Sequence, residues 1–286
     1  MMGVARRSLF VIALIAAAAV ASAQENTKVT SSVTDLDRMW DNFNREAATV
    51  GDGRFWVELR GLKLNKNDPK IGLNGYPVKD FERKNGSELT ELDGGRFDLI
   101  GAYGLGNAEL GIGLPLVLQE SLNFANGEDQ EHASFGDMTL YGKFKLELSE
   151  NWAWAPGLEM SIPTGRESVM LGSGDLGLNP FVSTRYQEGR LAIGAHLGFL
   201  LNTGSQPSVF NWSVQGIARA NSRFALRTEV TGQLYNAVGN TFNIISVYPG
   251  IDFNLTENFI IRPEGMAGLA YQAFDWGIGI GFVFTM

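Results

Sequence analysis

The sequence predicts an all-β protein: a transmembrane, antiparallel, up-and-down β-barrel of about twelve strands, with a short N-terminal helix. The last strand, the sorting of the connections and the inside–outside pattern of side chains all point to this fold. In residues 274–286 every second side chain is large and apolar, and the positions between are mostly glycine or small. A period of two places these sets on opposite faces of a strand. Such a strand suits a boundary between lipid and a crowded barrel interior.

The N-terminus has the pattern of a secretory signal. Arg6 and Arg7 precede an apolar run from Leu9 to Val20, and residues 21–23 form a small-residue cleavage site. The run is too short to span a membrane, so we expect residues 1–23 to be removed during export.

Composition narrows the range of functions. The chain has 286 residues, with 31 acidic against 23 basic residues and no cysteine. The acidic balance argues against nucleic-acid binding. The absence of cysteine excludes disulfides and thiolate metal sites. Metal-ligand spacing is also missing, and we expect no metal, no other cofactor and no enzymatic activity.

Residues 24–52 are expected to be a periplasmic segment with a short amphipathic helix. From Leu36 to Val50 apolar residues recur at intervals of three and four, and Thr34 is a candidate N-cap. The helix could lie against the end of the barrel or the membrane surface, or it could plug the pore.

Residues 53–286 are expected to form the barrel. Short turns alternate with longer connections, as the periplasmic and extracellular ends of an outer-membrane barrel require. Residues 119–134 are expected to be one of the long loops, with acidic, solvated side chains that include Glu120. Pro156, Pro180, Pro249 and Pro263 lie inside expected strands and leave the strand register around them open to bulges or shifts. The strands are expected at 54–64, 92–104, 107–118, 135–148, 151–163, 174–187, 190–202, 209–221, 223–235, 242–255, 258–272 and 274–286.

The two faces of these strands differ in polarity. The outward face is apolar through the middle of each strand, as in Leu110, Leu197 and Leu226, while the other face carries most of the charge. Glycines on the inner face, such as Gly279, are expected to widen the interior. The hairpin around 256–257 should place Arg262 beside Asp252. The candidate pore-lining residues are Tyr141, Lys143, Glu159, Arg185, His196, Arg227, Glu229, Tyr248, Asp252, Arg262 and Glu264.

These inward charges have two interpretations. Because both signs are interleaved, they could be structural ion pairs in a narrow, wet barrel. They could instead form a constriction that orients a small polar or amphipathic solute. No stretch has the single-sign excess of a strongly ion-selective pore.

Three segments carry a family resemblance: Gly157 to Gly165, Leu171 to Gly177, and Leu191 to Gly198. Pro163-Thr164-Gly165 and Leu171-Gly172-Ser173-Gly174 are the most specific parts. With these motifs the chain resembles, over about 107–286, the MetA-pathway of phenol degradation family of outer-membrane barrels. The resemblance implies the fold and an outer-membrane location, and it suggests uptake of aromatic compounds.

We therefore expect an outer-membrane channel for passive uptake of small solutes, with hydrophobic or aromatic compounds as candidates. Expected partners are outer-membrane lipids and lipopolysaccharide, the solute, and the barrel-assembly machinery, which would recognise the C-terminal strand. One alternative is a structural or surface-interaction barrel. Another is a lipid-modifying enzyme, because His132-Ala133-Ser134 resembles the His-x-Ser spacing of outer-membrane phospholipase A.

Overall fold

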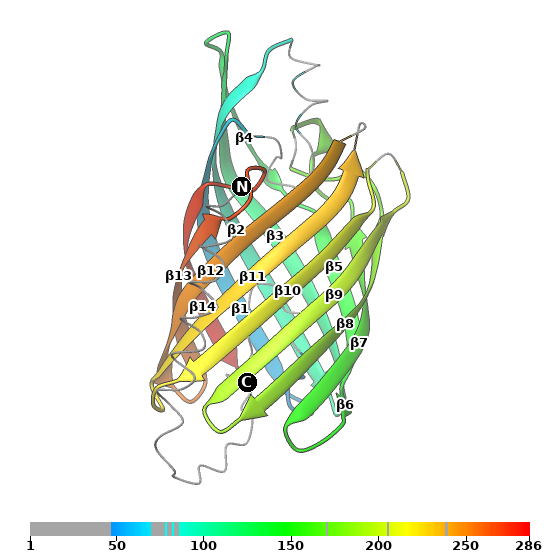
Figure 1. Ribbon diagram of the computed structural model, residues 1–286, viewed down its shortest axis with the longest axis vertical. Helices are drawn as coiled ribbons and strands as arrows, with labels where there is room; N and C mark the ends of the chain where they lie inside the picture. Colours follow the sequence, from blue (N-terminus) through cyan, green and yellow to red (C-terminus); the bar gives the residue numbers. More distant parts are fainter. Residues whose placement is uncertain are drawn as a thin grey trace, which may run out of the picture.

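The computed structural model describes residues 47–69, 78, 82, 86–169, 171–204, 206–237 and 240–286. Within these ranges the chain is a closed antiparallel β-barrel with strongly tilted strands (Figure 1). A 3₁₀ turn, η2 (Glu167–Val169), lies in the connection after β7. The strands are β1 (Phe55–Asn67), β2 (Leu89–Leu105), β3 (Ala108–Phe124), β4 (Asp129–Phe135), β5 (Met138–Phe144), β6 (Leu146–Glu147), β7 (Trp152–Ile162), β8 (Gly177–Glu188), β9 (Leu191–Asn202), β10 (Val209–Arg219), β11 (Phe224–Ala237), β12 (Asn240–Thr256), β13 (Phe259–Gly268) and β14 (Trp276–Thr285).

The barrel closes between its first and last strands. β14 pairs with β1, from Trp276 opposite Asn65 to Thr285 opposite Trp56. In the described part of the chain there are fourteen strands, but β4, β5 and β6 are pieces of one crossing of the wall. β3 pairs with β4 above and with β5 below, and β7 pairs with both β5 and β6. The wall is therefore crossed twelve times, which agrees with the predicted strand number.

Short and long connections between strands lie at opposite ends of the barrel, as predicted. The short ones, such as those at 106–107 and 189–190, lie at the same end as the C-terminus (Figure 1). Gly106 and Gly189 have φ of 64° and 56°, the left-handed conformation that two-residue hairpin turns need. By analogy with outer-membrane barrels this lower end is periplasmic, and the upper end is extracellular.

The loop expected at 119–134 is largely strand, so that prediction is wrong. β3 continues to Phe124 and β4 begins at Asp129, and the two strands pair in this region. The segment still alternates. Leu122 is buried, whereas Glu131 on the adjacent strand lies on the outer face. The hairpin therefore carries the wall beyond the other strands, with a polar exterior.

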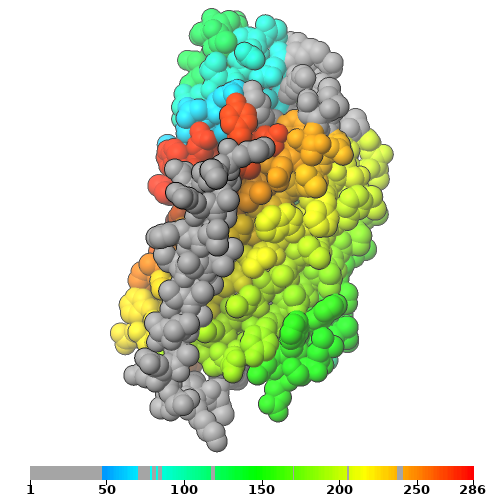
Figure 2. Space-filling model, in the orientation of Figure 1, coloured from blue at the N-terminus to red at the C-terminus, as the bar shows by residue number. Residues whose placement is uncertain are grey.

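The exterior is apolar at mid-height, as the alternation predicted. Leu158 and Leu197, near the middle of β7 and β9, are each more than half exposed. Over β9–β11 the outer side chains form one continuous surface (Figure 2). Within the described residues, charged side chains on this face such as Lys63, on the upper half of β1, and Glu131, on the upper hairpin, lie above the middle of the wall. No helix in the described residues is long and apolar enough to cross a membrane.

The prolines inside strands do not shift the register. Val247 opposite Ala267 and Gly250 opposite Glu264 keep one register on either side of Pro249. Pro249 itself still pairs with Thr228 of β11 on its other side. In a β-ladder the N–H and C=O of one residue point to the same neighbouring strand, so a proline weakens pairing on one side only.

The signal sequence and nearly all of the expected N-terminal helix lie outside the described residues. The end of that helix is visible, because residues 47–50 are described, and they are not helical. The backbone N–H of Val50, which a helix would direct at a preceding carbonyl, donates instead to Oε2 of Glu109 at 2.7 Å.

Candidate functional site

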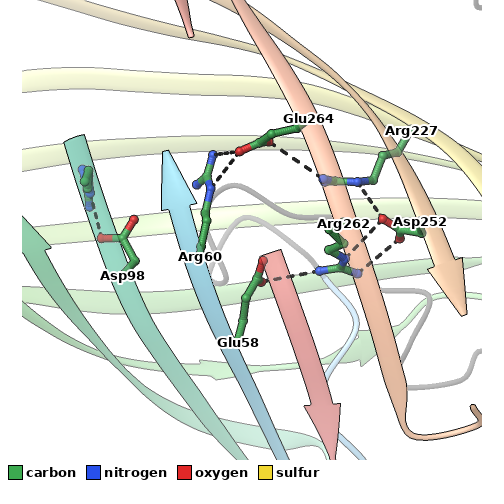
Figure 3. A network of polar contacts seen from close by, with 8 residues as sticks. Glu58, Arg60, Asp98, Arg227, Asp252, Arg262 and Glu264 are labelled. Carbon is green, nitrogen blue, oxygen red and sulfur yellow. Dashed lines mark hydrogen bonds and ion pairs between the residues drawn. The ribbon is translucent and has the colours of Figure 1, made fainter. Parts of the chain in front are cut away.

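A chain of six charged side chains occupies one wall of the barrel interior (Figure 3). They alternate in sign, and each contacts the next. Nη2 of Arg60 lies 2.7 Å from Glu264, and Nη2 of Arg227 lies 3.8 Å from the same carboxylate. The order along the chain is Arg60, Glu264, Arg227, Asp252, Arg262 and Glu58.

The predicted contact between Arg262 and Asp252 is confirmed, with Nε of Arg262 3.3 Å from Oδ1 of Asp252. Nη1 of Arg262 also lies 3.5 Å from Glu58, and all three side chains are almost fully buried. Buried ions are tolerated when opposite charges and hydrogen bonds surround them. The six groups form such an arrangement, with three charges of each sign. We call this set the charged chain.

Glycines on the inner face of β14 leave the space that the side chains of the charged chain occupy. β14 separates β13 from β1, so contacts between those two strands must pass over it. A Cβ at Gly279 would lie 2.7 Å from Oε1 of Glu264 and 2.9 Å from the backbone oxygen of Gly61. At Gly281 it would lie 2.5 Å from Oε1 of Glu58. These glycines do not widen the interior as expected, because neighbouring side chains cover them.

Replacing Gly279 by alanine should therefore lower the free energy of unfolding by about 1–3 kcal/mol, the usual cost of overpacking. The added methyl group would displace the Glu264 carboxylate from Arg60. Gly61→Ala is the matched control, because the nearest atom to its Cβ would be 3.8 Å away. Urea unfolding in detergent, followed by tryptophan fluorescence, compares the two. Equal stability of the two variants would show that Gly279 has no such role.

The opposite wall carries a row of hydrogen-bonded polar side chains, Ser183, His196, Asn211, Asn179 and Glu159, which we call the polar ladder. Nδ1 of His196 lies 3.0 Å from Oγ of Ser183, and Nε2 lies 3.1 Å from Oδ1 of Asn211. Asn211 donates to Asn179, and Asn179 donates to Glu159 at 3.5 Å. A Cβ at Gly198 would meet three of these groups within about 3.1 Å, so another inner-face glycine makes space for polar contacts.

At the lower end the chain segment before β1 is held inside the barrel. Val50 is fully buried and packs with Trp56, Ile100, Ala102, Ile260 and Val283. Its N–H donates to Glu109, and the same carboxylate accepts from the Tyr141 hydroxyl and lies 3.4 Å from Nζ of Lys143. Residues 47–50 therefore occupy part of the lower end of the interior.

An apolar layer crosses the upper end of the interior. It combines side chains from the barrel wall with side chains from the connections that follow β1, β7 and β13. Phe274 packs against both of the clusters that make up the layer, so the layer is continuous. Its members are Leu62, Leu64, Val78, Leu89, Leu92, Leu122, Phe124, Val169, Leu171, Leu200, Val209, Tyr235, Phe242, Ile244, Tyr248, Met266, Ala273 and Phe274.

The two motifs that carry the family resemblance, residues 163–165 and 171–174, are held together by hydrogen bonds to Asp137. We call this arrangement the clasp. Asp137, at the break between β4 and β5, accepts hydrogen bonds from the N–H groups of Gly165 and Ser173 at 2.9 and 2.7 Å. Gly165 and Gly172 pack so closely that a Cβ on Gly172 would lie 2.4 Å from the Gly165 backbone. The clasp directs Val169 and Leu171 into the apolar layer.

Asp137→Ala should release this connection. Trypsin cuts after arginine, and the exposed Arg166 lies inside the clasp, where cleavage requires local unfolding. We expect cleavage at Arg166 to become at least about tenfold faster in Asp137→Ala, since two hydrogen bonds to the Asp137 carboxyl group are lost. Asp129→Ala, on the exposed upper hairpin, is the control. An unchanged rate would show that Asp137 does not hold the connection.

A second acidic group fixes the connection before β14. Asp275 accepts from Nζ of Lys66 at 2.8 Å and from the backbone N–H of Asn67 at 3.0 Å. Burial acts to raise the pKa of Asp275, but these hydrogen bonds outweigh it and hold the pKa below its usual value. This contact keeps the Phe274 region at the end of β1.

All eleven candidate pore-lining side chains lie on the inner face. Four of them, Arg227, Asp252, Arg262 and Glu264, meet in the charged chain. Tyr141 and Lys143 meet at Glu109, and His196 and Glu159 belong to the polar ladder. Tyr248 packs on the apolar layer, and Glu229 of β11 lies directly opposite Tyr248 in the sheet. The guanidinium group of Arg185 donates to Gln187 at 2.7 Å.

Several residues of this interior were not among the candidates. Glu58, Arg60 and Glu109 share the inward alternation and could have been chosen from it. Ser183 and Asn211 could not, because neutral polar residues on an inner face carry no distinguishing signal. His132 lies on β4, where Nε2 contacts Oε1 of Gln130 at 3.3 Å. In the described residues no group of three or more histidine or acidic side chains is placed to hold a metal ion.

An apolar exterior, a closed antiparallel wall and a charged interior define an outer-membrane-type β-barrel. The chain belongs to the family described as "Putative MetA-pathway of phenol degradation", whose model matches residues 71–285. A search of curated proteins finds no match.

Solved structures share the fold. The COG4313 outer membrane channel from Pseudomonas putida F1 is 14% identical, with a TM-score of 0.66 over 87% of this chain and 100% of that one. The NanC porin is 11% identical, with a TM-score of 0.54 over 80% and 98% of the two chains. The KdgM porin is 8% identical, with a TM-score of 0.50 over 80% and 98%.

Proposed function

We propose that this protein is an outer-membrane channel for the passive uptake of small solutes that are largely apolar. The observation that carries the proposal is the apolar layer across the upper end of the interior. A water-filled pore for polar solutes would be lined with polar groups at its mouth. Here a solute that enters from outside first meets leucine, phenylalanine and valine side chains from three connections and several strands.

Below the layer the solute would pass between the charged chain and the polar ladder. The eleven candidate residues are proposed to line this passage. The charged chain has no formal net charge, and its members contact one another, so it supports no strong selection for ions of one sign. The proposal includes export by a cleaved signal, contact of the exterior with outer-membrane lipid and lipopolysaccharide, and recognition of β14 by the barrel-assembly machinery.

The test is uptake by a porin-deficient Gram-negative host. Cells that express the protein should accumulate a small aromatic compound faster than cells with an empty vector, and they should gain little uptake of a disaccharide. Equal gains for both solutes would indicate a general porin. No gain in uptake of either solute, together with no conductance in planar bilayers, would favour the second candidate function, a structural or surface-interaction barrel. The upper β3–β4 hairpin supports this candidate because it extends the wall outward.

A further inference from the structure

Glu120 is a buried carboxyl group beside the apolar layer. It lies on β3, its side chain has no exposed surface, and among the described residues no hydrogen-bond donor reaches either of its carboxyl oxygens. This distinguishes it from four other buried acidic groups of the interior. Glu58, Glu109, Asp252 and Glu264 each lie within 4 Å of an arginine or lysine nitrogen.

The alternation of β3 directs Glu120 into the apolar layer. Leu122 and Phe124, two and four residues further along the strand, point to the same face and belong to the layer. Across the sheet, Glu120 pairs with Gly94 of β2, and Gly94 pairs with Leu64 of β1. Gly94 has no side chain, so no β2 side chain stands between Glu120 and Leu64 at this level of the sheet.

A carboxyl group in such a place normally has a partner. Burying a polar group without a hydrogen bond costs free energy, and buried polar groups in proteins are nearly always bonded. The oxygens of Glu120 can accept hydrogen bonds. Its neighbours along the inner face of β3, Leu122 and Phe124, are hydrocarbon, and His132, opposite Glu120 on β4, contacts Gln130 and gives Glu120 no hydrogen bond. The partner that would satisfy the Glu120 oxygens must therefore supply a donor and must otherwise be apolar.

We propose that Glu120 is the polar contact of a binding site in the apolar layer, and that the site takes a small apolar molecule with one O–H or N–H donor. The hydrocarbon part of the molecule lies against Leu64, Leu92 and Leu122, and its donor points to the carboxyl group. The proposal rests on the proposed function, because it makes this site the first stop of a solute that enters from outside.

Binding of fluorinated probes to the protein in lipid nanodiscs tests the site. ¹⁹F NMR titrations compare 4-fluorophenol, which has a hydroxyl donor, with 4-fluorotoluene, which has none, and empty nanodiscs correct for partition into lipid. We expect the wild type to bind 4-fluorophenol about tenfold more tightly, the usual effect of one hydrogen bond to a buried group. 4-Fluorobenzylamine, with an ammonium donor, shows whether the site prefers a neutral or a charged donor.

Two variants locate the effect. Glu120→Leu should bring the preference for 4-fluorophenol close to one and leave 4-fluorotoluene binding unchanged. Glu120→Gln keeps an acceptor oxygen and should retain most of the preference. Glu128→Leu, in the exposed turn of the same hairpin, is the matched control and should behave as the wild type does. Heat-modified mobility on gels confirms that each variant is folded.

A wild type without the preference, or a Glu120→Leu variant that keeps it, would overturn this inference. Either result is separate from the proposed function, because uptake by the porin-deficient host is measured with the unmodified protein. If cells take up the aromatic compound but the protein shows no binding preference, the channel proposal is retained and the Glu120 site is rejected. If neither the uptake nor the binding preference is observed, the channel proposal is rejected as well.

Discussion

Arg262→Met is expected to destabilise the barrel by about 3–5 kcal/mol, the cost of removing one partner from a buried ionic network. The Arg262 side chain has no exposed surface, and it contacts both Asp252 and Glu58. Without its guanidinium group, Glu58 loses the cation at 3.5 Å, and Asp252 keeps its ion pair with Arg227, whose Nε lies 2.9 Å away. Urea unfolding in detergent, followed by tryptophan fluorescence, measures the difference.

Lys145→Met provides the control for this loss. Lys145 and Glu147 form an ion pair of 2.7 Å, but the Glu147 side chain is 65% exposed. An exposed pair contributes about 0–1 kcal/mol, so this variant should unfold close to the wild type. If Arg262→Met costs no more than Lys145→Met, then water reaches the charged chain and screens it, and it does not act as a single buried network.

The alternation of side chains was sufficient to predict the wall of the barrel. β14 shows why, because its outer residues from Trp276 to Phe284 and its inner glycines admit one orientation between lipid and interior. A slip of one residue would expose the glycines and bury the aromatic groups. The same reasoning placed Arg262 beside Asp252, since a tight hairpin fixes which residues are opposite.

The sequence could not show what fills the interior. Gly279 was expected to widen the barrel, because a glycine in a sequence does not reveal which neighbour lies over it. Glu120 was assigned to a solvated loop, because acidic residues gather around it, although its spacing from Leu122 and Phe124 already matched the inner face. Contacts between strands that are distant along the chain, such as Arg60 with Glu264, depend on barrel closure and have no local signal.

The segment before β1 leads to the second large effect. Deleting residues 24–50 is expected to raise single-channel conductance in planar bilayers by about twofold or more, since removing side chains from a narrow passage widens its conducting path. Ala47 and Val50 have no exposed surface, and Val50 packs at the lower end of the interior among Trp56, Ile100 and Val283. The deletion also frees Glu109 from the backbone of Val50, while Tyr141 and Lys143 still hold its carboxylate.

A shorter deletion, of residues 24–46, separates two explanations. It retains Ala47, Ala48 and Val50, whose burial and hydrogen bond to Glu109 are the described contacts of this segment. If these residues narrow the lower opening by themselves, the shorter deletion should conduct as the wild type does and only the longer one should conduct more. A rise in both would assign the obstruction to residues before Ala47, in agreement with a plug. Wild-type conductance in both would assign the segment to the periplasmic side, where its packing on the inner face anchors the first strand without limiting flow.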